Sequence, residues 1–270
     1  MNTGEDRARS AASTPVAREI VSYGPHERQV CEWFLPISVK QAPLVVVVHG
    51  GFWRPKWTRE IEDATCLDLA EHGFAVCNIE YRAYDNAWPA IFADVSAGIA
   101  ATITYADQHD INTGRSAILG HSAGGALALW AICQPPPSTQ GPDQLSVDHR
   151  FQLAIASAPV ACLTKASSER LGDGAVDHMM GGSATDAPQR YALTDPFLLR
   201  PKPSTVIYLL HGRADEDVPL HISEAYLEHA RSNGNPGELI IFENDGHYEI
   251  LDPTSQVSTF RRSLLQTLKD

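Results

Sequence analysis

The pentapeptide GHSAG at residues 120–124 constrains the fold of this chain more than any other stretch, because of what lies on either side of it. Residues 115–119 before it are β-prone and mostly apolar, and residues 123–133 after it favour a helix. A G-x-S-x-G sequence between a strand and a helix is typical of a nucleophile elbow, a sharp turn that exposes a serine hydroxyl. Glycines at both ends of such a turn remove side chains that would collide there. The sequence therefore predicts a strand–turn–helix unit with Ser122 at its apex.

A second turn, HGGFW at residues 49–53, directly follows the apolar run at residues 44–48, which predicts a strand buried on both faces. Two glycines allow backbone N–H groups to face a substrate oxygen without interference from Cβ atoms. A turn of this kind upstream of a nucleophile elbow is typical of an oxyanion hole. The predicted donors are the N–H groups of Gly51, Phe52 and Ala123. The alternative is an ordinary glycine turn at the end of a core strand.

An acidic loop, HGRADEDVP at residues 211–219, follows the apolar run at residues 206–210. A carboxylate just past a strand end is where a catalytic triad needs the residue that orients its imidazole. We expect Asp215 to fill this role, with Asp217 as the competing residue and Glu216 as a weaker competitor. Acids that are not used in this way are expected in a solvated turn before the next helix.

His247 is the predicted general base. It lies in the segment DGHY at residues 245–248, in a loop after the apolar run at residues 239–242, from which it can fold back over the serine. Of the 11 histidines, it alone combines a loop after a strand with a position beyond both other members of the triad. The chain thus places Ser122 first, then Asp215, and then His247.

This order of serine, aspartate and histidine is that of the α/β-hydrolases and differs from the orders in chymotrypsin and subtilisin. The chain resembles the α/β-hydrolase superfamily from about residue 20 to its C-terminus. The HGGFW segment is similar to the H-G-G-x-W signature of the kynurenine formamidase (arylformamidase) branch and of related carboxylesterases. Segments at residues 78–82, 88–95 and 181–196 resemble blocks of esterase and lipase relatives. The resemblance implies an esterase-type hydrolase without a cofactor.

Apolar, β-prone runs alternate with helix-prone segments along the chain. Strands are predicted at residues 20–23, 29–35, 44–48, 75–79, 116–119, 152–157, 206–210 and 239–242, the first two as an antiparallel edge. Helices are predicted at residues 58–72, 90–108, 123–133, 220–232 and 253–268. The alternation predicts an α/β-hydrolase fold, with a mostly parallel central sheet of about eight strands and helices on both faces. Ligands are then expected beyond the carboxyl ends of the strands.

The chain length of 270 residues suits one α/β domain, predicted at residues 18–270. Residues 1–17 are polar and lack the apolar core of a secretory signal, so they are predicted to be a disordered leader. Residues 134–148 contain three consecutive prolines and are predicted to form a surface loop. Residues 165–203 are rich in glycine and proline and are predicted to form a short lid with one or two helices.

The composition of the chain argues against several classes of binding partner. The net charge of −12 argues against binding to nucleic acid or to anionic membranes, which attract basic surfaces. No apolar run is long enough to predict a transmembrane helix. The five cysteines are an odd number without C-x-x-C spacing, which favours reduced, buried thiols in a cytoplasmic protein. The histidines and cysteines show no metal-binding pattern, so neither a metal nor another cofactor is predicted. The oligomeric state stays open, a homodimer included.

Aromatic residues gather near the predicted site, where an apolar pocket with a few polar groups would hold a substrate. We predict Trp53 after the oxyanion turn, His121 in the elbow, Trp88 and Tyr248 as pocket residues. For Trp53 and Trp88, ordinary packing of loops on the sheet is an equal alternative.

These residues together predict a serine hydrolase that cleaves a small carboxylic ester through an acyl-enzyme. The alternative is an arylformamidase that hydrolyses N-formylkynurenine or a similar N-formyl aryl amide, because the two reactions share all the machinery. A remote alternative is a catalytically silent ligand-binding protein on the same fold.

Overall fold

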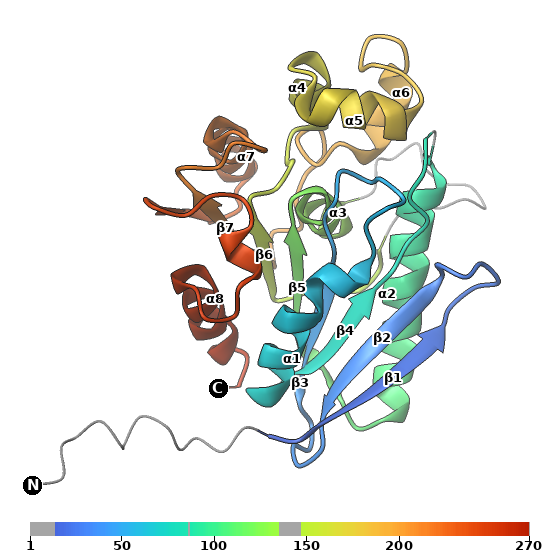
Figure 1. The fold of residues 1–270 in the computed structure, drawn as a ribbon, viewed down its shortest axis with the longest axis vertical. Coiled ribbons are helices and arrows are strands. Elements are labelled where there is room, and N and C mark those ends of the chain that lie inside the picture. Colours follow the sequence, from blue (N-terminus) through green and yellow to red (C-terminus); the bar gives the residue numbers. More distant parts are fainter. Residues whose placement is uncertain (1–13, 86, 135–146, 270) are drawn as a thin grey trace, which may run out of the picture.

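An eight-stranded sheet runs through the part of the chain that the structure describes (Figure 1). The structure is a computed structural model, and it describes residues 14–85, 87–134 and 147–269. The strands lie in the order β1-β2-β4-β3-β5-β6-β7-β8; β2 runs antiparallel to β1 and β4, and the other neighbours are parallel. Their bounds are β1 (Val16–Ser22), β2 (Val30–Pro36), β3 (Pro43–Val48), β4 (Ala75–Ile79), β5 (Asn112–His121), β6 (Leu153–Ser157), β7 (Val206–Gly212) and β8 (Glu238–Phe242). The predicted α/β sheet with its antiparallel edge is confirmed.

The strand β3 illustrates why the central strands form. All six residues of its sequence PLVVVV are buried, and so are all five residues of β4. Valine favours the extended backbone, and a parallel strand covered on both faces can be apolar throughout. Val45 and Val47 belong to one hydrophobic core, whereas Val46 and Val48 belong to the other, because successive side chains point to opposite faces.

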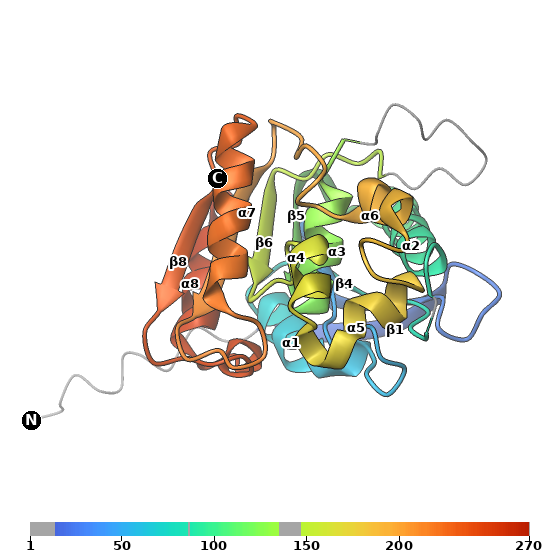
Figure 2. The ribbon, with the colours of Figure 1, turned by 90° about the horizontal axis from the view of Figure 1, so that it is seen from above.

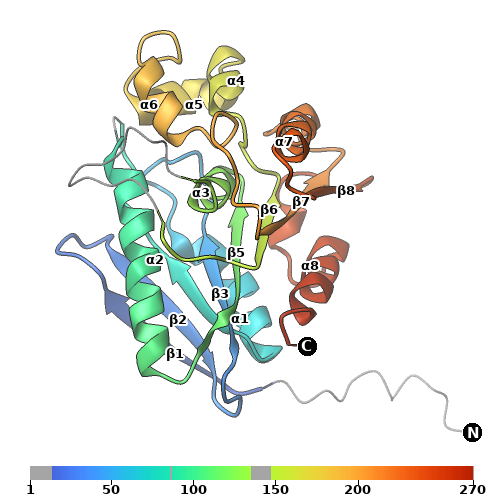
Figure 3. The same cartoon turned by 180° about the vertical axis from the view of Figure 1, so that it is seen from behind.

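Helices cover both faces of the sheet. One core receives side chains from α2 (Ala90–Gln108), α3 (Ala123–Ala131) and α7 (Leu220–Ser232). The other receives side chains from α1 (Asp63–Glu71) and α8 (Gln256–Gln266). Figure 3 shows α2 and α3 in front of the strands, so the layers are helix, sheet and helix.

The lid segment forms three short helices, α4 (Leu163–Ser168), α5 (Leu171–Met180) and α6 (Pro188–Thr194), where one or two were predicted. They lie beyond the carboxyl ends of the central strands (Figures 1 and 2). The break between α4 and α5 comes from left-handed backbone at Arg170, and a second left-handed residue, Asp173, lies in a kink inside α5. Sequence patterns do not predict this conformation for non-glycine residues.

The buried carboxylate of Asp195 connects the two ends of the lid segment. Its two oxygens accept hydrogen bonds from the backbone N–H groups of Leu163 and Thr164, at 3.0 and 2.8 Å. Asp195 therefore ties the start of α4 to the chain that follows α6.

Several predicted boundaries differ from the structure for local reasons. The strand β5 begins at Asn112 because Asn112 pairs with Pro43 before a shift of register. The helix α8 begins after Ser255, whose hydroxyl accepts a hydrogen bond from the N–H of Ser258 and caps the first turn. The predicted helix at residues 58–72 starts as the 3₁₀ helix η1 (Arg59–Glu62).

Two predicted segments extend beyond the described residues. The predicted leader overlaps the sheet, because β1 already begins at Val16; residues 1–13 lie outside the described residues. The same holds for residues 135–146 of the predicted surface loop. None of the helices in the described part of the chain is long and apolar enough to cross a membrane.

Candidate active site

Ser122 lies at a sharp turn between β5 and α3, with φ 55° and ψ −119°. This left-handed conformation is strained for serine and is held by a hydrogen bond from the Ser122 N–H to the carbonyl of Ser157, at 2.9 Å. The flanking glycines leave room for it: a Cβ atom on Gly120 would collide with the backbone of Gly124, and one on Gly124 would collide with Val48. The predicted strand–turn–helix unit is present, with glycine required at both ends.

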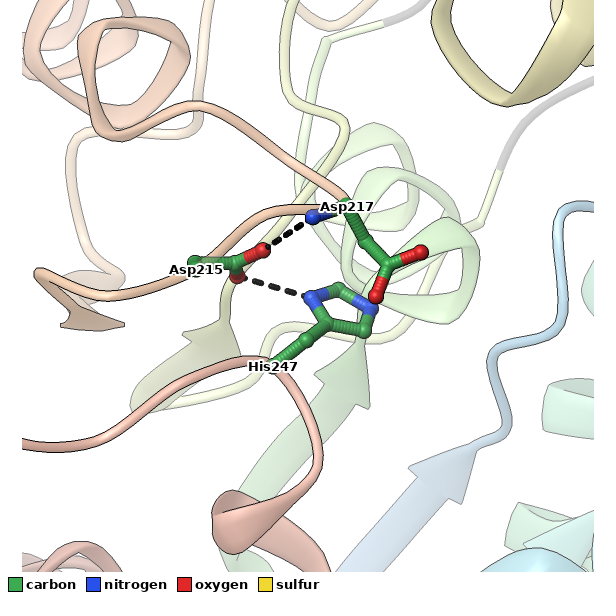
Figure 4. Close-up of side chains that lie close together, drawn as sticks. All are labelled: Asp215, Asp217 and His247. Atoms are coloured by element: carbon green, nitrogen blue, oxygen red, sulfur yellow. Dashed lines mark hydrogen bonds and ion pairs between the residues drawn. The ribbon is translucent and has the colours of Figure 1, made fainter.

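An acid–base pair lies beyond the ends of β7 and β8. The Nδ1 atom of His247 donates a hydrogen bond to Oδ2 of Asp215 at 2.7 Å (Figure 4). The other oxygen of Asp215 accepts hydrogen bonds from the backbone N–H groups of Asp217 and Val218, at 2.9 and 2.8 Å. The side chain of Asp215 is fully buried. The structure thus brings Asp215, and not its competitors, to Nδ1 of the predicted base.

The charge on Asp215 is well stabilised. Burial alone would raise the pKa of this carboxyl, but the neighbouring imidazoles of His211 and His247 and the Val218 backbone N–H outweigh it, so the pKa lies well below its usual range. His211 itself is buried and lies with Nε2 3.4 Å from Asp215 Oδ2. Its ring is fixed because Nε2 donates to the Val218 carbonyl at 2.9 Å and Nδ1 accepts from the Ser223 hydroxyl at 2.8 Å.

Asp217 lies on the other side of the imidazole. Figure 4 shows its carboxylate beside the ring edge of His247 that faces away from Asp215. One ligand atom each from Asp215, Asp217 and His247 lie within 4.8 Å of one another, so these three residues are the ones that could hold a metal ion in the described part of the chain. His247 would have to give up its Nδ1 hydrogen bond to Asp215, or bind the ion through Nε2. The remaining competitor, Glu216, is exposed.

His121 packs against the predicted base from within the elbow. The two rings lie 4.6 Å apart, and His121 Nε2 donates a hydrogen bond to the His247 carbonyl at 3.0 Å. Burial, followed by repulsion from His247, lowers the pKa of His121 to about 3. His121 is therefore a neutral side chain that holds the backbone of His247.

Ser122 and His247 line the same small cavity, which has a volume of about 100 Å³. Its remaining walls are mostly apolar and comprise Gly51, Phe52, Trp57, Ile61, His121, Tyr248 and Leu251. Within the described residues, no hydrogen bond joins the Ser122 side chain to His247. Such contacts are often long in ligand-free sites and tighten when substrate binds.

A larger groove of about 670 Å³ adjoins this cavity, and Phe52 lines both. The groove lies between the segment after the HGG turn and the lid helix α5. Its walls combine aromatic and charged side chains, namely Phe52, Trp53, Arg54, Pro55, Lys56, Tyr84, Asp85, Ala175, His178 and Met179.

The HGG turn has an unusual backbone, with positive φ at Gly51 (111°), Phe52 (49°) and Trp53 (55°). At Gly51 a Cβ atom would run into the side chain of Trp57, so glycine is required by space as well as by conformation. The turn is anchored where the Tyr81 hydroxyl donates to the His49 carbonyl at 2.7 Å.

The third predicted oxyanion donor, Ala123, directly follows the serine in the chain. Ala123 is the first residue of α3, and the N–H groups of a first helical turn have no acceptor within their own helix.

Three of the four predicted pocket residues line these spaces: His121 and Tyr248 line the small cavity, and Trp53 lines the groove. Trp88 does not belong to either lining. Its ring instead packs on the main hydrophobic core, with the guanidinium of Arg190 5.1 Å from the ring centre, so the packing alternative describes it.

Sequence reasoning missed Ile61 and Leu251, which close the small cavity. Ile61 comes from η1, and Leu251 follows the base by four residues in the 3₁₀ helix η2 (Glu249–Leu251). For Leu251, its closeness to His247 in the sequence could have indicated a place at the site. For Ile61 no such signal exists, because an apolar residue in η1 cannot be told from a core residue by its sequence.

The strand order, the serine at a strand–helix turn and the Asp–His pair beyond the strand ends define this protein as an α/β-hydrolase of the esterase type. The chain belongs to the BD-FAE family, whose pattern matches residues 33–229.

Curated relatives agree with this assignment. The chain is 26% identical over 199 residues to "Probable carboxylic ester hydrolase LipM" of Mycobacterium tuberculosis. The aligned stretch covers 70% of this chain and 45% of the relative. It is 23% identical over 258 residues to "Probable isoprenylcysteine alpha-carbonyl methylesterase ICME" of Oryza sativa subsp. japonica. This alignment covers 88% of this chain and 59% of the relative. The chain thus spans about half the length of the curated relatives it matches.

Solved structures share the fold. A truncated carbohydrate esterase from gut microbiota superposes with a TM-score of 0.75 at 20% identity, covering 96% of this chain and 98% of the other. Esterase B from Lactobacillus Rhamnosis superposes with a TM-score of 0.78 at 20% identity, covering 94% and 85%.

Proposed function

We propose that this protein is a serine esterase that cleaves a small carboxylic ester through an acyl-enzyme. The observation that carries the proposal is the Asp215–His247 hydrogen bond at 2.7 Å, in a site where His247 shares a cavity with Ser122 at the elbow. A serine in a strained strand–helix turn, a base and a buried carboxylate are the three groups that acyl transfer from a serine requires.

The reaction follows from these roles. His247 removes the proton of the Ser122 hydroxyl while the oxygen attacks the ester carbonyl, which forms a tetrahedral oxyanion. The oxyanion collapses, the bond to the alcohol breaks, and the alcohol leaves with the proton from His247. Water then attacks the acyl-enzyme in the same way and releases the acid. Asp215 holds the imidazole with Nδ1 protonated and stabilises the imidazolium as it forms.

The oxyanion is proposed to bind the backbone N–H groups of Gly51, Phe52 and Ala123. The positive φ values at Gly51 and Phe52 support this role, because they turn the backbone in a way that a regular strand end would not. Ala123 adds the first turn of a helix, where N–H groups and the helix dipole favour negative charge.

The shape of the site supports a small ester. The cavity at Ser122 holds about 100 Å³ and is mostly apolar, which suits a short group next to the carbonyl carbon. The groove beyond Phe52 gives room for the larger part of the substrate. The curated relatives whose names refer to carboxylic ester hydrolysis agree with this class of reaction.

A second candidate is arylformamidase activity on N-formylkynurenine or a similar formamide. Its support is the charge of the groove, which is lined by Arg54 and by an exposed Asp85–His178 pair whose side chains lie 3.7 Å apart. Such a pattern suits the carboxylate and ammonium of an amino acid. A formyl group would also fit the small cavity.

Comparing turnover of p-nitrophenyl acetate and N-formylkynurenine by the same preparation tests both candidates. Faster hydrolysis of the ester supports an esterase, and a strong preference for the formamide supports the alternative. Labelling of Ser122 by a fluorophosphonate probe tests the shared mechanism. A folded protein that resists the probe would contradict a serine mechanism and favour a silent binding protein.

A further inference from the structure

A small space lined by buried residues lies beneath the nucleophile elbow, on the face of the sheet that α1 and α8 cover. Its walls are Val47, Glu62, Thr65, Leu119, Gly120, His121, Ser157 and Arg261. It offers about 10 Å³ to the centre of a water molecule, close to the roughly 10–15 Å³ that one water molecule needs on this measure. The space is distinct from the cavity at Ser122, although His121 lines both.

Three polar atoms of residues that line this space are buried without a hydrogen-bond partner among the described residues. They are Oε1 of Glu62, Nε of Arg261 and Nδ1 of His121. The exposed fractions of these residues are 2%, 3% and 5%. Buried polar atoms are expensive when unpaired, and three residues that line one space each carry one, which favours a shared partner.

The charges of Glu62 and Arg261 offset only part of the effect that burial has on each other's pKa. Burial raises the pKa of Glu62 while Arg261 lowers it, and burial lowers the pKa of Arg261 while Glu62 raises it. The Nη2 atom of Arg261 donates to the Ser258 hydroxyl at 2.9 Å, which fixes the guanidinium. Its Nε–H is then available as a donor, whereas Glu62 Oε1 and His121 Nδ1 are acceptors.

We propose that this space binds one water molecule that joins Glu62, Arg261 and His121. The water accepts a hydrogen bond from Arg261 Nε–H and donates its two hydrogens to Glu62 Oε1 and His121 Nδ1. This count of three hydrogen bonds is typical of a buried water, and it satisfies every unpaired polar atom named above.

The water has a consequence for the base, and this part rests on the proposed function. A donor at Nδ1 of His121 places the ring proton on Nε2, because the bond at one imidazole nitrogen sets the state of the other. That proton is the one donated to the His247 carbonyl at 3.0 Å. Glu62, Arg261 and the water are therefore positioning groups that act on the base through His121.

The first test counts the water. The double variant Glu62→Leu/Arg261→Met replaces a buried charge pair by apolar side chains of similar size, a change that often preserves folding. Oxygen-17 relaxation dispersion should show one long-lived internal water fewer than in the wild type. The matched control Glu60→Leu/Arg262→Met alters neighbouring charges that do not line the space and should keep the wild-type count. An unchanged count in the first variant would overturn the water site.

A high-resolution crystal structure gives the same test directly. We expect one water within hydrogen-bond distance of Glu62 Oε1, Arg261 Nε and His121 Nδ1. Direct contact between Arg261 Nε and either acceptor, with no water between them, would refute the proposal.

The second test measures positioning. The Glu62→Leu/Arg261→Met variant should lose about 10-fold to 100-fold in kcat with little change in KM, because the base is misplaced while the substrate walls are intact. His121→Leu should lower kcat by a similar factor. The triple variant should lose no more kcat than His121→Leu alone, because Glu62 and Arg261 act on the base only through His121. Additive losses, or an unchanged kcat in the folded double variant, would contradict the positioning role. A wild type without esterase turnover would refute the proposed function and leave the water count unaffected.

Discussion

At the scale of single residues, the site is built from side chains that have little freedom. Ser122 is buried to 2% exposure in a strained turn, and Asp215 has both carboxylate oxygens engaged. Fixed groups need no reorganisation when charge develops, which is the main electrostatic advantage of an enzyme over water. The roles proposed for these residues can therefore be separated by single substitutions.

Replacing Ser122 by alanine tests the nucleophile. We expect turnover to fall by roughly 10³-fold to 10⁶-fold, because no acyl-enzyme can form. Circular dichroism and thermal unfolding should show an intact fold, since the Ser122 hydroxyl makes no hydrogen bond with any other described residue, whereas its backbone N–H bonds the Ser157 carbonyl. A folded Ser122→Ala protein with wild-type esterase activity would rule out the proposed triad.

The acid is tested by comparing Asp215→Asn with Asp217→Asn. Asparagine at residue 215 can donate to His247 Nδ1, which favours the wrong tautomer, and turnover should fall by about 10⁴-fold. Asp217→Asn is the matched control, because its carboxylate makes no hydrogen bond to Nδ1, and it should keep most activity. The reverse ranking in steady-state assays would transfer the role to Asp217.

At the scale of elements, the backbone of two turns is proposed to supply the hydrogen-bond donors of the site, in place of side chains. The HGG turn after β3 and the elbow after β5 are adjacent because these two strands pair in the sheet. Backbone N–H groups from both turns can then converge on one oxygen. The cost is conformational: three consecutive residues, Gly51, Phe52 and Trp53, have positive φ.

Replacing Gly51 by valine tests the oxyanion turn. The side chain would collide with Trp57 and tilt the turn, and loss of one donor typically costs about 10²-fold to 10³-fold in turnover. Gly234→Val is the matched control: Gly234 also has positive φ, but a Cβ there meets nothing within 4 Å. It should lose stability, by about 1–3 kcal/mol, without losing turnover. Normal turnover of folded Gly51→Val would mean that the turn is only the end of a core strand.

At the scale of the whole molecule, the parallel sheet gathers the functional loops at one edge. The loops after β3, β5, β7 and β8 all leave the sheet there, and the lid helices lie beyond the same edge (Figure 1). The charges that stabilise the reaction are proposed to come from these loops and from the α3 dipole, and not from a metal ion.

Chelation tests this proposal on the intact enzyme. EDTA should leave esterase activity unchanged, because no proposed step uses a metal ion. Excess Zn²⁺ should inhibit reversibly, since an ion held by Asp217 and His247 would occupy the nitrogen that accepts the serine proton. Loss of activity in EDTA that added metal restores would indicate a metal hydrolase and contradict the mechanism.

The secondary-structure elements and their order could be predicted from local patterns along the chain. The valine run of β3 and the alternation of strands and helices predicted the sheet, because burial on both faces leaves a continuous apolar signal. The glycines of the elbow were equally informative, since each leaves space that only glycine can leave. Chain order then sufficed to choose Ser122, His247 and the acidic loop at residues 211–219 as the sources of the three groups.

The contacts between residues that are distant in the chain could not be predicted before the fold was known. Sequence left Asp215 and Asp217 open, because both lie in one loop and a shift of two residues is invisible before folding. It took Trp88 for a pocket residue with packing as the alternative, and it gave no sign that Glu62 and Arg261 share a space beneath the elbow. Thr65 and Arg261, which line that same space, are separated by 196 residues. Local patterns report how a segment folds, whereas contacts across the sheet depend on how all the segments pack.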